Sequence, residues 1–317
     1  MKRASLLFVL GVAACSPEPI NNADQEVGLE ERAYPAPGFV DFLAVDGETV
    51  WTTNRRRVEQ WARDGLRSKV PIPGPCGTMV VHEASLWVAN CEDLNLYRVD
   101  TDTATVTTVI ETGIAEPRGE TNVVAGAGSI WVPSDSAGII SRIDPATNEV
   151  VARIEVVPGT FFLAFGFDSL WAVSSERQLL QRIDPSSNSI SGTAELGNQP
   201  GFLVAGEGAV WVQEQQDGTV AKILPDELSL AARTMVGETL LYGDIDVGGG
   251  KVWLRTTEDQ TFVTLDAESG EILTRYGEAA GSGAIRFTEE GIWTSAHDIE
   301  RMSWWSKSGA EQSVREE

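Results

Sequence analysis

The chain consists of short apolar runs that alternate with turn-forming residues. Residues 200–237 show the pattern most clearly, where Gly206-Glu207-Gly208 separates the first run from the second. The four runs of this segment occupy residues 202–205, 209–212, 219–224 and 230–236. Short runs bounded by Gly, Pro, Asp and Gln are typical of β-strands, and no copy of the pattern has a convincing 3.6-residue period. The segment therefore predicts four antiparallel strands.

A tryptophan recurs in the second run of each such unit, at intervals of 36 to 44 residues. Seven of the ten tryptophans follow this rule: Trp51, Trp87, Trp131, Trp171, Trp211, Trp253 and Trp293. A period near 40 residues indicates one supersecondary unit copied along the chain. Four antiparallel strands per unit predict an all-β fold, a seven-bladed β-propeller. A parallel solenoid is the alternative, but its coils are shorter and lack this hairpin-rich unit.

A second signature ends the third run of several copies. It reads RIDPATNEV at 142–150 and RIDPSSNSI at 182–190. The aspartate accepts local backbone N–H bonds, proline presets φ, and asparagine tolerates the left-handed conformation. We interpret these residues as parts of turns. Metal binding by the recurrent aspartates is the alternative.

The segment 126–148 carries a resemblance to known proteins. It reads G-x-G-S-I-W-V and then G-x-x-S-R-I-D-P-A-T-N, and it resembles the bacterial YVTN-repeat propellers and the virginiamycin B lyase-like propellers. The resemblance extends over about residues 38 to 300 and implies the fold. In the lyases a histidine acts as general base, helped by acids and a divalent metal, to open a lactone ester. His297, with Asp298 beside it, is the candidate here, although the strings W-F-[TS]-E and N-x-I-G-x-I of the lyases are missing.

The first residues predict an address outside the cytoplasm. Residues 1–14 have a basic start and a short apolar run, as a secretory signal peptide does. Val12-Ala13-Ala14-Cys15 resembles the lipobox of bacterial lipoproteins, which implies lipid attachment at Cys15. Ser16 then implies sorting to the outer membrane. An ordinary signal peptide with an incidental cysteine is the alternative. We interpret residues 15–35 as a flexible acidic tether and residues 36–317 as the propeller.

Cysteines and charge add two expectations. Cys76 and Cys91 are the remaining cysteines, and an extracytoplasmic compartment permits a disulfide between them. Both belong to loops at the same end of the second blade, which supports the pairing; two free thiols are the alternative. The formal net charge is −23, which disfavours nucleic acid and anionic membranes as partners. We expect a monomer that meets a membrane only through the lipid at Cys15.

Offsets from the tryptophans predict which residues reach the mouth of the central channel. Seven positions before each tryptophan, five of the seven copies have a small apolar residue, whereas the last two have Asp246 and Arg286. These two lie in adjacent blades, and we expect an ion pair that acts as a strut or belongs to a ligand site. Further candidate ligand-binding residues at this end are Asn90, Arg118, Glu214 and Asp244, with Glu120 in the same loop as Arg118. Phe161, Phe162 and Phe202 approach the mouth as core residues or as an apolar patch.

The leading functional hypothesis is a binding module that recognises a protein, peptide or cell-envelope ligand through its channel face. It needs no cofactor. The competing hypothesis is a metal-assisted lyase or hydrolase that uses His297 and channel carboxylates. Calcium or magnesium would then be required, and Asn122, Glu214 and Asp244 are the residues that a lactonase-type calcium site could use. No phosphate loop, H-E-x-x-H motif or Cys/His cluster is present in the sequence.

Ring closure has two possible solutions in the sequence. The polar stretch after Trp305 could form the outer strand of the seventh blade, and this is the solution we expect. Alternatively, residues 25–34 could supply that strand and join the two ends of the chain.

Overall fold

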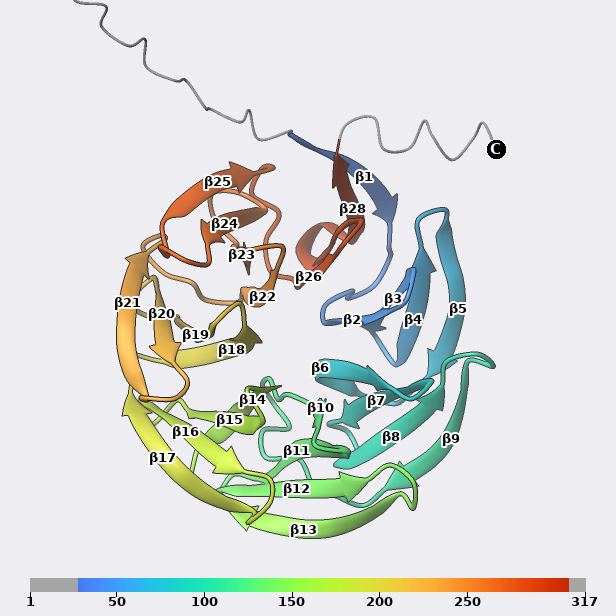
Figure 1. Cartoon of the computed structure of the whole chain (residues 1–317). Coiled ribbons are helices and arrows are strands. Elements are labelled where there is room, and N and C mark those ends of the chain that lie inside the picture. The colour runs from blue at the N-terminus through green and yellow to red at the C-terminus, as the bar shows by residue number, and fades with distance from the viewer. Residues whose placement is uncertain (1–27, 308–317) are drawn as a thin grey trace, which may run out of the picture.

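The computed structural model describes residues 28–307, which form seven four-stranded antiparallel sheets arranged in a ring (Figure 1). The predicted seven-bladed all-β propeller is confirmed. The predicted signal peptide and the lipidated Cys15 lie outside the described residues. Within residues 28–307, no helix has the length and apolar character needed to cross a membrane.

The first four blades follow one another along the chain. Blade one contains β2 (Leu43–Asp46), β3 (Thr49–Asn54), β4 (Arg57–Ala62) and β5 (Gly65–Pro71). Blade two contains β6 (Pro75–His82), β7 (Ser85–Asn90), β8 (Asn95–Asp100) and β9 (Thr105–Ile110). Blade three contains β10 (Val124–Gly126), β11 (Ser129–Asp135), β12 (Ile139–Asp144) and β13 (Glu149–Glu155). Blade four contains β14 (Thr160–Gly166), β15 (Ser169–Ser174), β16 (Leu179–Asp184) and β17 (Ser189–Glu195).

The remaining blades complete the ring. Blade five contains β18 (Pro200–Gly206), β19 (Ala209–Glu214), β20 (Thr219–Leu224) and β21 (Ser229–Met235). Blade six contains β22 (Asp244–Gly248), β23 (Lys251–Arg255), β24 (Phe262–Asp266) and β25 (Ile272–Tyr276). Blade seven contains β26 (Ile285–Thr288), β27 (Gly291–Ala296), the 3₁₀ turn η1 (His297–Ile299), β28 (Arg301–Lys307) and β1 (Leu29–Pro35).

The outer strand of blade seven comes from the N-terminal side of the chain. β1 pairs antiparallel with β28, from Leu29 opposite Lys307 to Pro35 opposite Arg301. Our expectation that the C-terminal stretch would supply this strand is therefore wrong, and residues 29–35 of the predicted tether belong to the propeller. Pairing the two ends of the chain in one sheet satisfies an edge that would otherwise stay open.

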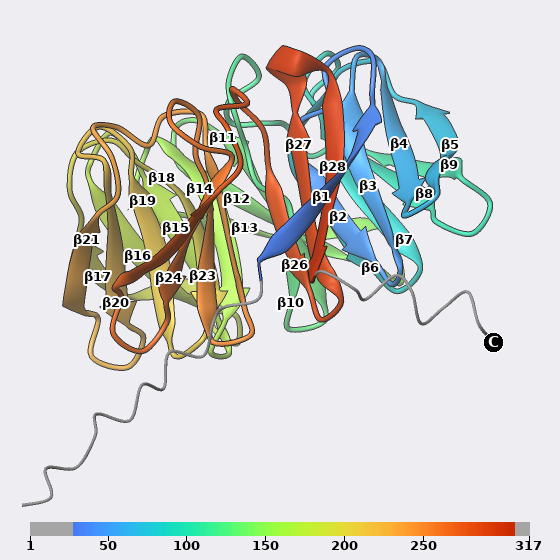
Figure 2. The same cartoon turned by 90° about the horizontal axis from the view of Figure 1, so that it is seen from above.

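The two faces of the ring differ in what they carry (Figure 2). We call the face with η1 and the loops that enter the first strands the mouth face. The face with the turns between first and second strands, such as residues 47–48, is the turn face. Because Leu29 pairs with Lys307 and Pro35 with Arg301, β1 begins on the turn face and ends on the mouth face.

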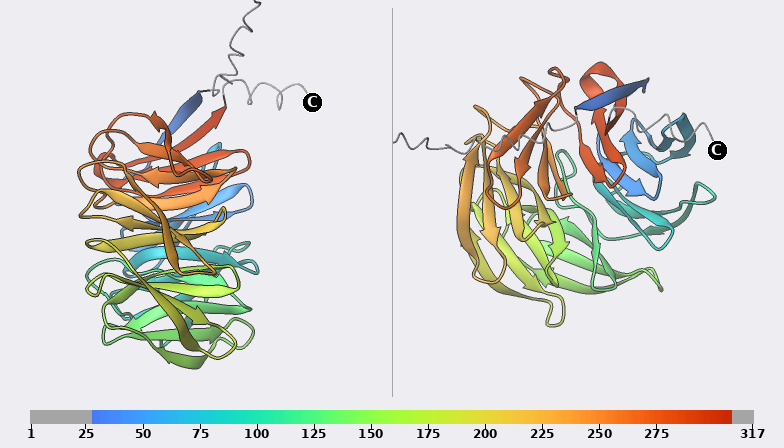
Figure 3. Two further views of the ribbon diagram at one scale, coloured as in Figure 1. Left: turned by 60° about the vertical axis from the view of Figure 1, so that its left-hand side comes forward. Right: turned by 45° about the horizontal axis from the view of Figure 1, so that its top comes forward.

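The repeating tryptophans lie between blades, where they are almost completely buried. One cluster joins Trp131 and Ile140 of blade three to Leu163 and Leu170 of blade four. Removing a buried tryptophan side chain typically costs about 3–5 kcal/mol. The recurrent residue is thus a packing element between neighbouring blades, whose sheets follow one another around the ring in Figure 3.

The Asp-Pro turns tie neighbouring blades together. Arg142 Nη1 donates to the Pro185 carbonyl at 2.6 Å and to Asn188 Oδ1 at 2.9 Å, in the turn of the next blade. The same guanidinium lies 4.7 Å above the ring of Trp131. Asn188 has a φ of 53°, which is the left-handed conformation that the sequence predicts for it. Because Asp184 accepts hydrogen bonds from Ser186 and Ser187 of its own turn, the interpretation of this motif as a structural turn is supported.

Candidate functional site

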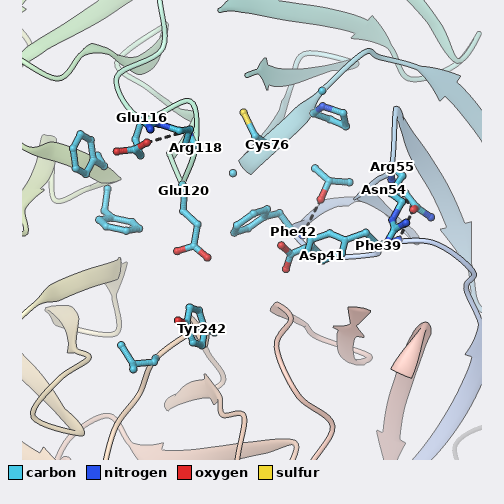
Figure 4. A pocket seen from close by; sticks show the side chains of 18 of the residues that line it. Phe39, Asp41, Phe42, Asn54, Arg55, Cys76, Glu116, Arg118, Glu120 and Tyr242 are labelled. Carbon is cyan, nitrogen blue, oxygen red and sulfur yellow. Dashed lines mark hydrogen bonds between the residues drawn. The ribbon is translucent and has the colours of Figure 1, made fainter. Parts of the chain in front are cut away.

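An open cavity of about 1000 Å³ occupies the centre of the mouth face (Figure 4). Its walls are loops and strand ends of the first six blades and the segment that enters blade one from blade seven. Phe39, Asp41 and Phe42 come from that segment, and Glu120 and Tyr242 come from the loops that enter blades three and six. Loops held by a rigid ring are a common position for binding residues.

Aromatic side chains close the channel below this cavity. Phe202 lies 5.9 Å from Phe42 and 4.9 Å from Phe162, measured between ring centroids. These three rings come from blades one, four and five and are buried. Phe162 and Phe202 are therefore core residues, as one of our two interpretations held, while the partly buried Phe161 lines the cavity wall. The floor of the site is apolar.

Two carboxyl groups, Asp41 and Glu120, point into the open centre of the cavity (Figure 4). We call them the carboxylate pair. Within residues 28–307 neither side chain accepts a hydrogen bond or forms a salt bridge. Burial raises the pKa of Glu120 to about 7, with a smaller contribution from the charge of Asp244. Burial, followed by the charge of Glu120, raises the pKa of Asp41 well above its usual range.

Asp41 is a functional candidate that our sequence reasoning missed. It lies ten residues before Trp51, and four of the other six copies have glycine at this position: Gly77, Gly201, Gly243 and Gly283. At Gly77 and Gly283 a Cβ would collide with a backbone carbonyl of a neighbouring segment. An aspartate where the repeat mostly has glycine is the signal that could have identified it.

Arg286 forms its ion pair with Asp244 and not, as we had expected, with Asp246. Arg286 Nη1 donates to Asp244 Oδ2, whereas Asp246 accepts from the backbone amides of Val247 at 2.9 Å and Phe287 at 2.8 Å. Burial raises the pKa of Asp246 to about 6, while the nearby charge of Arg286 opposes that rise. Asp244 lies two residues before Asp246 on the same strand, and it is closer to the mouth face. All three residues join blade six to blade seven.

Asn90 and Glu214 hold loops in place, and we had predicted both as ligand-binding residues. Asn90 Oδ1 accepts from the amides of Gly74 at 2.8 Å and Glu92 at 3.2 Å. Glu214 is fully buried, and it accepts from Gly197 N at 2.6 Å and from Arg233 Nη2 at 2.8 Å. Burial raises the pKa of Glu214, but the hydrogen bonds from Arg233, Thr219 and Gly197 bring it below the usual value. Neither residue lines the cavity.

The other predicted residues are divided between the cavity and its surroundings. Arg118 is exposed on the rim of the cavity, and Cys76 lines its wall. The predicted disulfide between Cys76 and Cys91 is confirmed. His297 lies at the mouth face but does not line the cavity, since its ring stacks on Phe39 with 3.9 Å between centroids. Burial lowers the pKa of His297, although the charge of Asp298 opposes this.

Arg255 is a second residue that our sequence reasoning missed. It is fully buried between blades six and seven, where Nε donates to Ser295 O at 3.2 Å and Nη1 to Thr261 O at 2.8 Å. Burial lowers its pKa to about 10. Its charge acts on Asp41 and partly opposes the rise of that pKa. The guanidinium is thus a positive charge near Asp41, although it does not line the cavity.

Two of the three candidate calcium ligands are occupied by other contacts, since Glu214 is bound to Arg233 and Asp244 to Arg286. Asn122 Nδ2 donates to Leu163 O at 3.1 Å, while its Oδ1 is buried and accepts no hydrogen bond within the described residues. In the described part of the chain, no three His, Cys, Asp or Glu side chains are grouped so that they could hold a metal ion. These residues therefore do not fit a calcium site of the expected kind.

No protein-family model and no curated protein matches this sequence. Solved structures do match. A streptogramin B lyase structure has a TM-score of 0.75 at 12% identity and covers 88% of this chain and 98% of that chain. A mitotic checkpoint complex chain has a TM-score of 0.75 at 13% identity, covering 95% and 98%. Hydrazine synthase of Kuenenia stuttgartiensis has a TM-score of 0.72 at 14% identity, covering 86% and 96%. At these identities the likeness shows that the chain shares the β-propeller fold with these proteins.

Proposed function

We propose that this protein is a lipid-anchored, extracytoplasmic binding module that takes up part of a protein, peptide or cell-envelope molecule in its channel-mouth cavity. The observation that carries the proposal is the open cavity of about 1000 Å³, inside which the carboxylate pair has no partner among the described residues. A partly buried carboxylate without a partner is costly for the free protein, so such groups commonly mark functional sites. The aromatic floor adds apolar contact area beneath them.

The course of β1 agrees with an anchor at Cys15. This strand begins at Leu29 on the turn face, on the side opposite to the cavity. A chain that is anchored upstream of Leu29 would therefore turn the cavity away from the membrane. Ligands would then be bound from the aqueous side.

Lipid attachment at Cys15 has a direct test. In a Gram-negative host grown with radiolabelled palmitate, we expect the full chain to take up label and to fractionate with the outer membrane. The Cys15→Ser variant should carry no label. Equal labelling of both chains would remove the anchor from the proposal.

The alternative function is a metal-assisted lyase or hydrolase that uses His297 and channel carboxylates. One observation favours it, because Glu120 has a pKa of about 7 and general acid–base catalysis works best near the operating pH. Against it, His297 packs on Phe39 outside the cavity, so it and Glu120 do not form one constellation. Mass spectrometry for metals in purified protein separates the two functions. A divalent ion near one per chain that is lost in Glu120→Gln would favour the enzyme.

Binding at the mouth can be tested with an array of random dodecapeptides. We expect the wild-type chain to bind a subset of them, and the Glu120→Arg/Tyr242→Ala variant to lose that subset. The control is Glu48→Arg, which changes an exposed acid on the turn face by the same charge. A binding pattern that survives in the mouth variant, or that is lost in the control, would contradict the proposal.

A further inference from the structure

The acidic side chains around the channel mouth are of two kinds. Asp244 is paired with Arg286, Glu214 with Arg233, and the two oxygens of Asp246 accept backbone amides. Each of these groups already has the partners that a buried carboxylate needs. The carboxylate pair, Asp41 and Glu120, lacks any such partner within the described chain and is open to the cavity.

The electrostatics of the carboxylate pair call for a positive charge. The charge of Glu120 disfavours ionisation of Asp41, and Asp244 disfavours ionisation of Glu120. Arg255 is the cation that offsets this at Asp41, but its hydrogen bonds go to Ser295, Thr256 and Thr261. A cation placed between the two carboxyl groups would interact with both of them in a site that is partly shielded from water.

The lining around the carboxylate pair is mixed, and aromatic rings form part of it. The buried rings of Phe42 and Phe162 line the cavity. The exposed rings of Phe39 and Tyr242 also line it (Figure 4). Such a lining suits an aliphatic arm that carries a charge at its end, because the arm contacts the rings while the charge reaches the acids. A bare metal ion would leave these surfaces unused, and the described residues offer no three-ligand metal group.

Exposed arginines also line the cavity, with Glu116 beside Arg118. Arg55 and Arg118 are exposed there, next to the acidic interior. Their guanidinium groups can donate to carbonyl or carboxylate oxygens that flank an inserted side chain. A peptide chain provides such oxygens on both sides of each residue, whereas a simple amine does not.

We propose that the cavity binds a basic side chain, lysine or arginine, of a peptide or protein chain, with its cation between Asp41 and Glu120. The proposal rests on the binding function given above and specifies its ligand class. The aliphatic part of the side chain contacts Phe42, Phe162 and Tyr242. The arginines of the rim bind the neighbouring backbone.

The experiment uses the full chain and capped hexapeptides that differ only at one central residue: lysine, arginine, norleucine or glutamate. Binding is followed by NMR shifts of backbone amides at Phe39, Gly119 and Glu120, with peptide concentrations into the millimolar range. We expect the lysine and arginine peptides to bind at least about tenfold more tightly than norleucine, which keeps the arm and removes the charge. Glu120→Gln and Asp41→Asn should each weaken the lysine peptide several-fold.

The matched control is Glu176→Gln, which neutralises an exposed acid on the mouth face outside the cavity and should leave affinity unchanged. Calorimetry in two buffers of different ionisation enthalpy adds a second readout. The lysine peptide should release protons near pH 7, because a bound cation favours the ionised forms of Glu120 and Asp41, which also face Asp244, Arg255 and Asp298.

Three results would overturn the inference. Equal affinity for the lysine and norleucine peptides would rule out recognition of the cation, although the cavity would still be a binding site. Butylammonium chloride or magnesium chloride binding at least as tightly as the lysine peptide would assign the site to a small cation. If none of the four peptides shifts the cavity amides at millimolar concentration, the proposed ligand class is wrong. If the wild-type chain binds no subset of the peptide array, or if the mouth variant keeps that subset, the binding function itself is wrong.

Discussion

Neighbouring blades are joined by different polar interactions in blades three to five and in the sector from blade six to blade one. In blades three to five, Arg142 and Arg182 reach the turn after the third strand of the next blade, where each donates to the carbonyl of a proline, Pro185 or Pro225. In the other sector Asp244 and Arg286 form a buried pair between blades, and Arg255 is buried with no carboxylate of the described residues at contact distance. Residues that recur in several blades join neighbouring blades, whereas residues that depart from the repeat lie around the channel mouth.

The difference has an energetic consequence. An exposed or turn-bound cation loses little when its surroundings change, because water replaces its partners. A buried charge cannot recover its hydration, so removal of its partner leaves it uncompensated. The sector from blade six to blade one should therefore tolerate single substitutions less well than blades three to five. Three substitutions test this difference.

Arg286→Met should be the most destabilising substitution, with a loss of about 3–5 kcal/mol in the free energy of unfolding, because it leaves Asp244 buried and unpaired. Urea denaturation followed by tryptophan fluorescence measures the effect. The double variant Asp244→Asn/Arg286→Met should recover a large part of the loss. A loss below about 1 kcal/mol in the single variant would show that the pair is solvated and that the two sectors do not differ.

Glu120→Gln should stabilise the protein, and only at higher pH. The pKa of Glu120 is raised to about 7 in the folded chain from 4.5, so the native state holds more protons than the unfolded state between these values. Its ionisation therefore lowers stability as pH rises through about 7. We expect the variant to gain of the order of 2–3 kcal/mol at pH 8 and almost nothing at pH 4. Denaturation curves at the two pH values check this, and an equal gain at both would contradict the assigned pKa.

Arg142→Ala should cost about 1–2 kcal/mol, since the charged hydrogen bonds to Pro185 and Asn188 and the contact with Trp131 are lost at a partly exposed site. The measurement is the same urea titration. Arg142→Lys serves as the comparison, because Lys222 performs the equivalent role in blade five, where Nζ donates to the carbonyl of Ala267 at 2.8 Å. If Arg142→Ala proved as costly as Arg286→Met, the contrast between the sectors would fail.

Much of the architecture was predictable because it depends on local, repeated chemistry. The spacing of Trp131 and Trp171 identified the unit, and the Asp-Pro-x-x-Asn turns predicted left-handed asparagines that the structure has at Asn148 and Asn188. Counting from the tryptophans also placed Cys76 and Cys91 on one face, where they form the disulfide. Each of these features needs only a short stretch of chain.

The candidate site was less predictable because its residues are joined only across the ring. Asp246 and Asp244 are two positions apart on one strand, and both approach Arg286, so the choice of partner depends on side-chain reach across the interface between blades. Glu214 and Asn90 resembled ligand residues because they are polar and follow the tryptophan strand. In the structure, loop amides that approach them from other segments use their oxygens.

Hydrophobic alternation and turn residues act over a few positions, so the blade, the number of blades and the turn chemistry could be predicted from the amino-acid sequence, and the disulfide was the favoured state of the two cysteines. Only the folded ring shows which strand closes it, which acid pairs with Arg286, and that Asp41 and Glu120 face one cavity. Those outcomes depend on closure of the ring, which brings residues from distant blades around a common axis and removes water from some of them, while the carboxylate pair has no partner within residues 28–307.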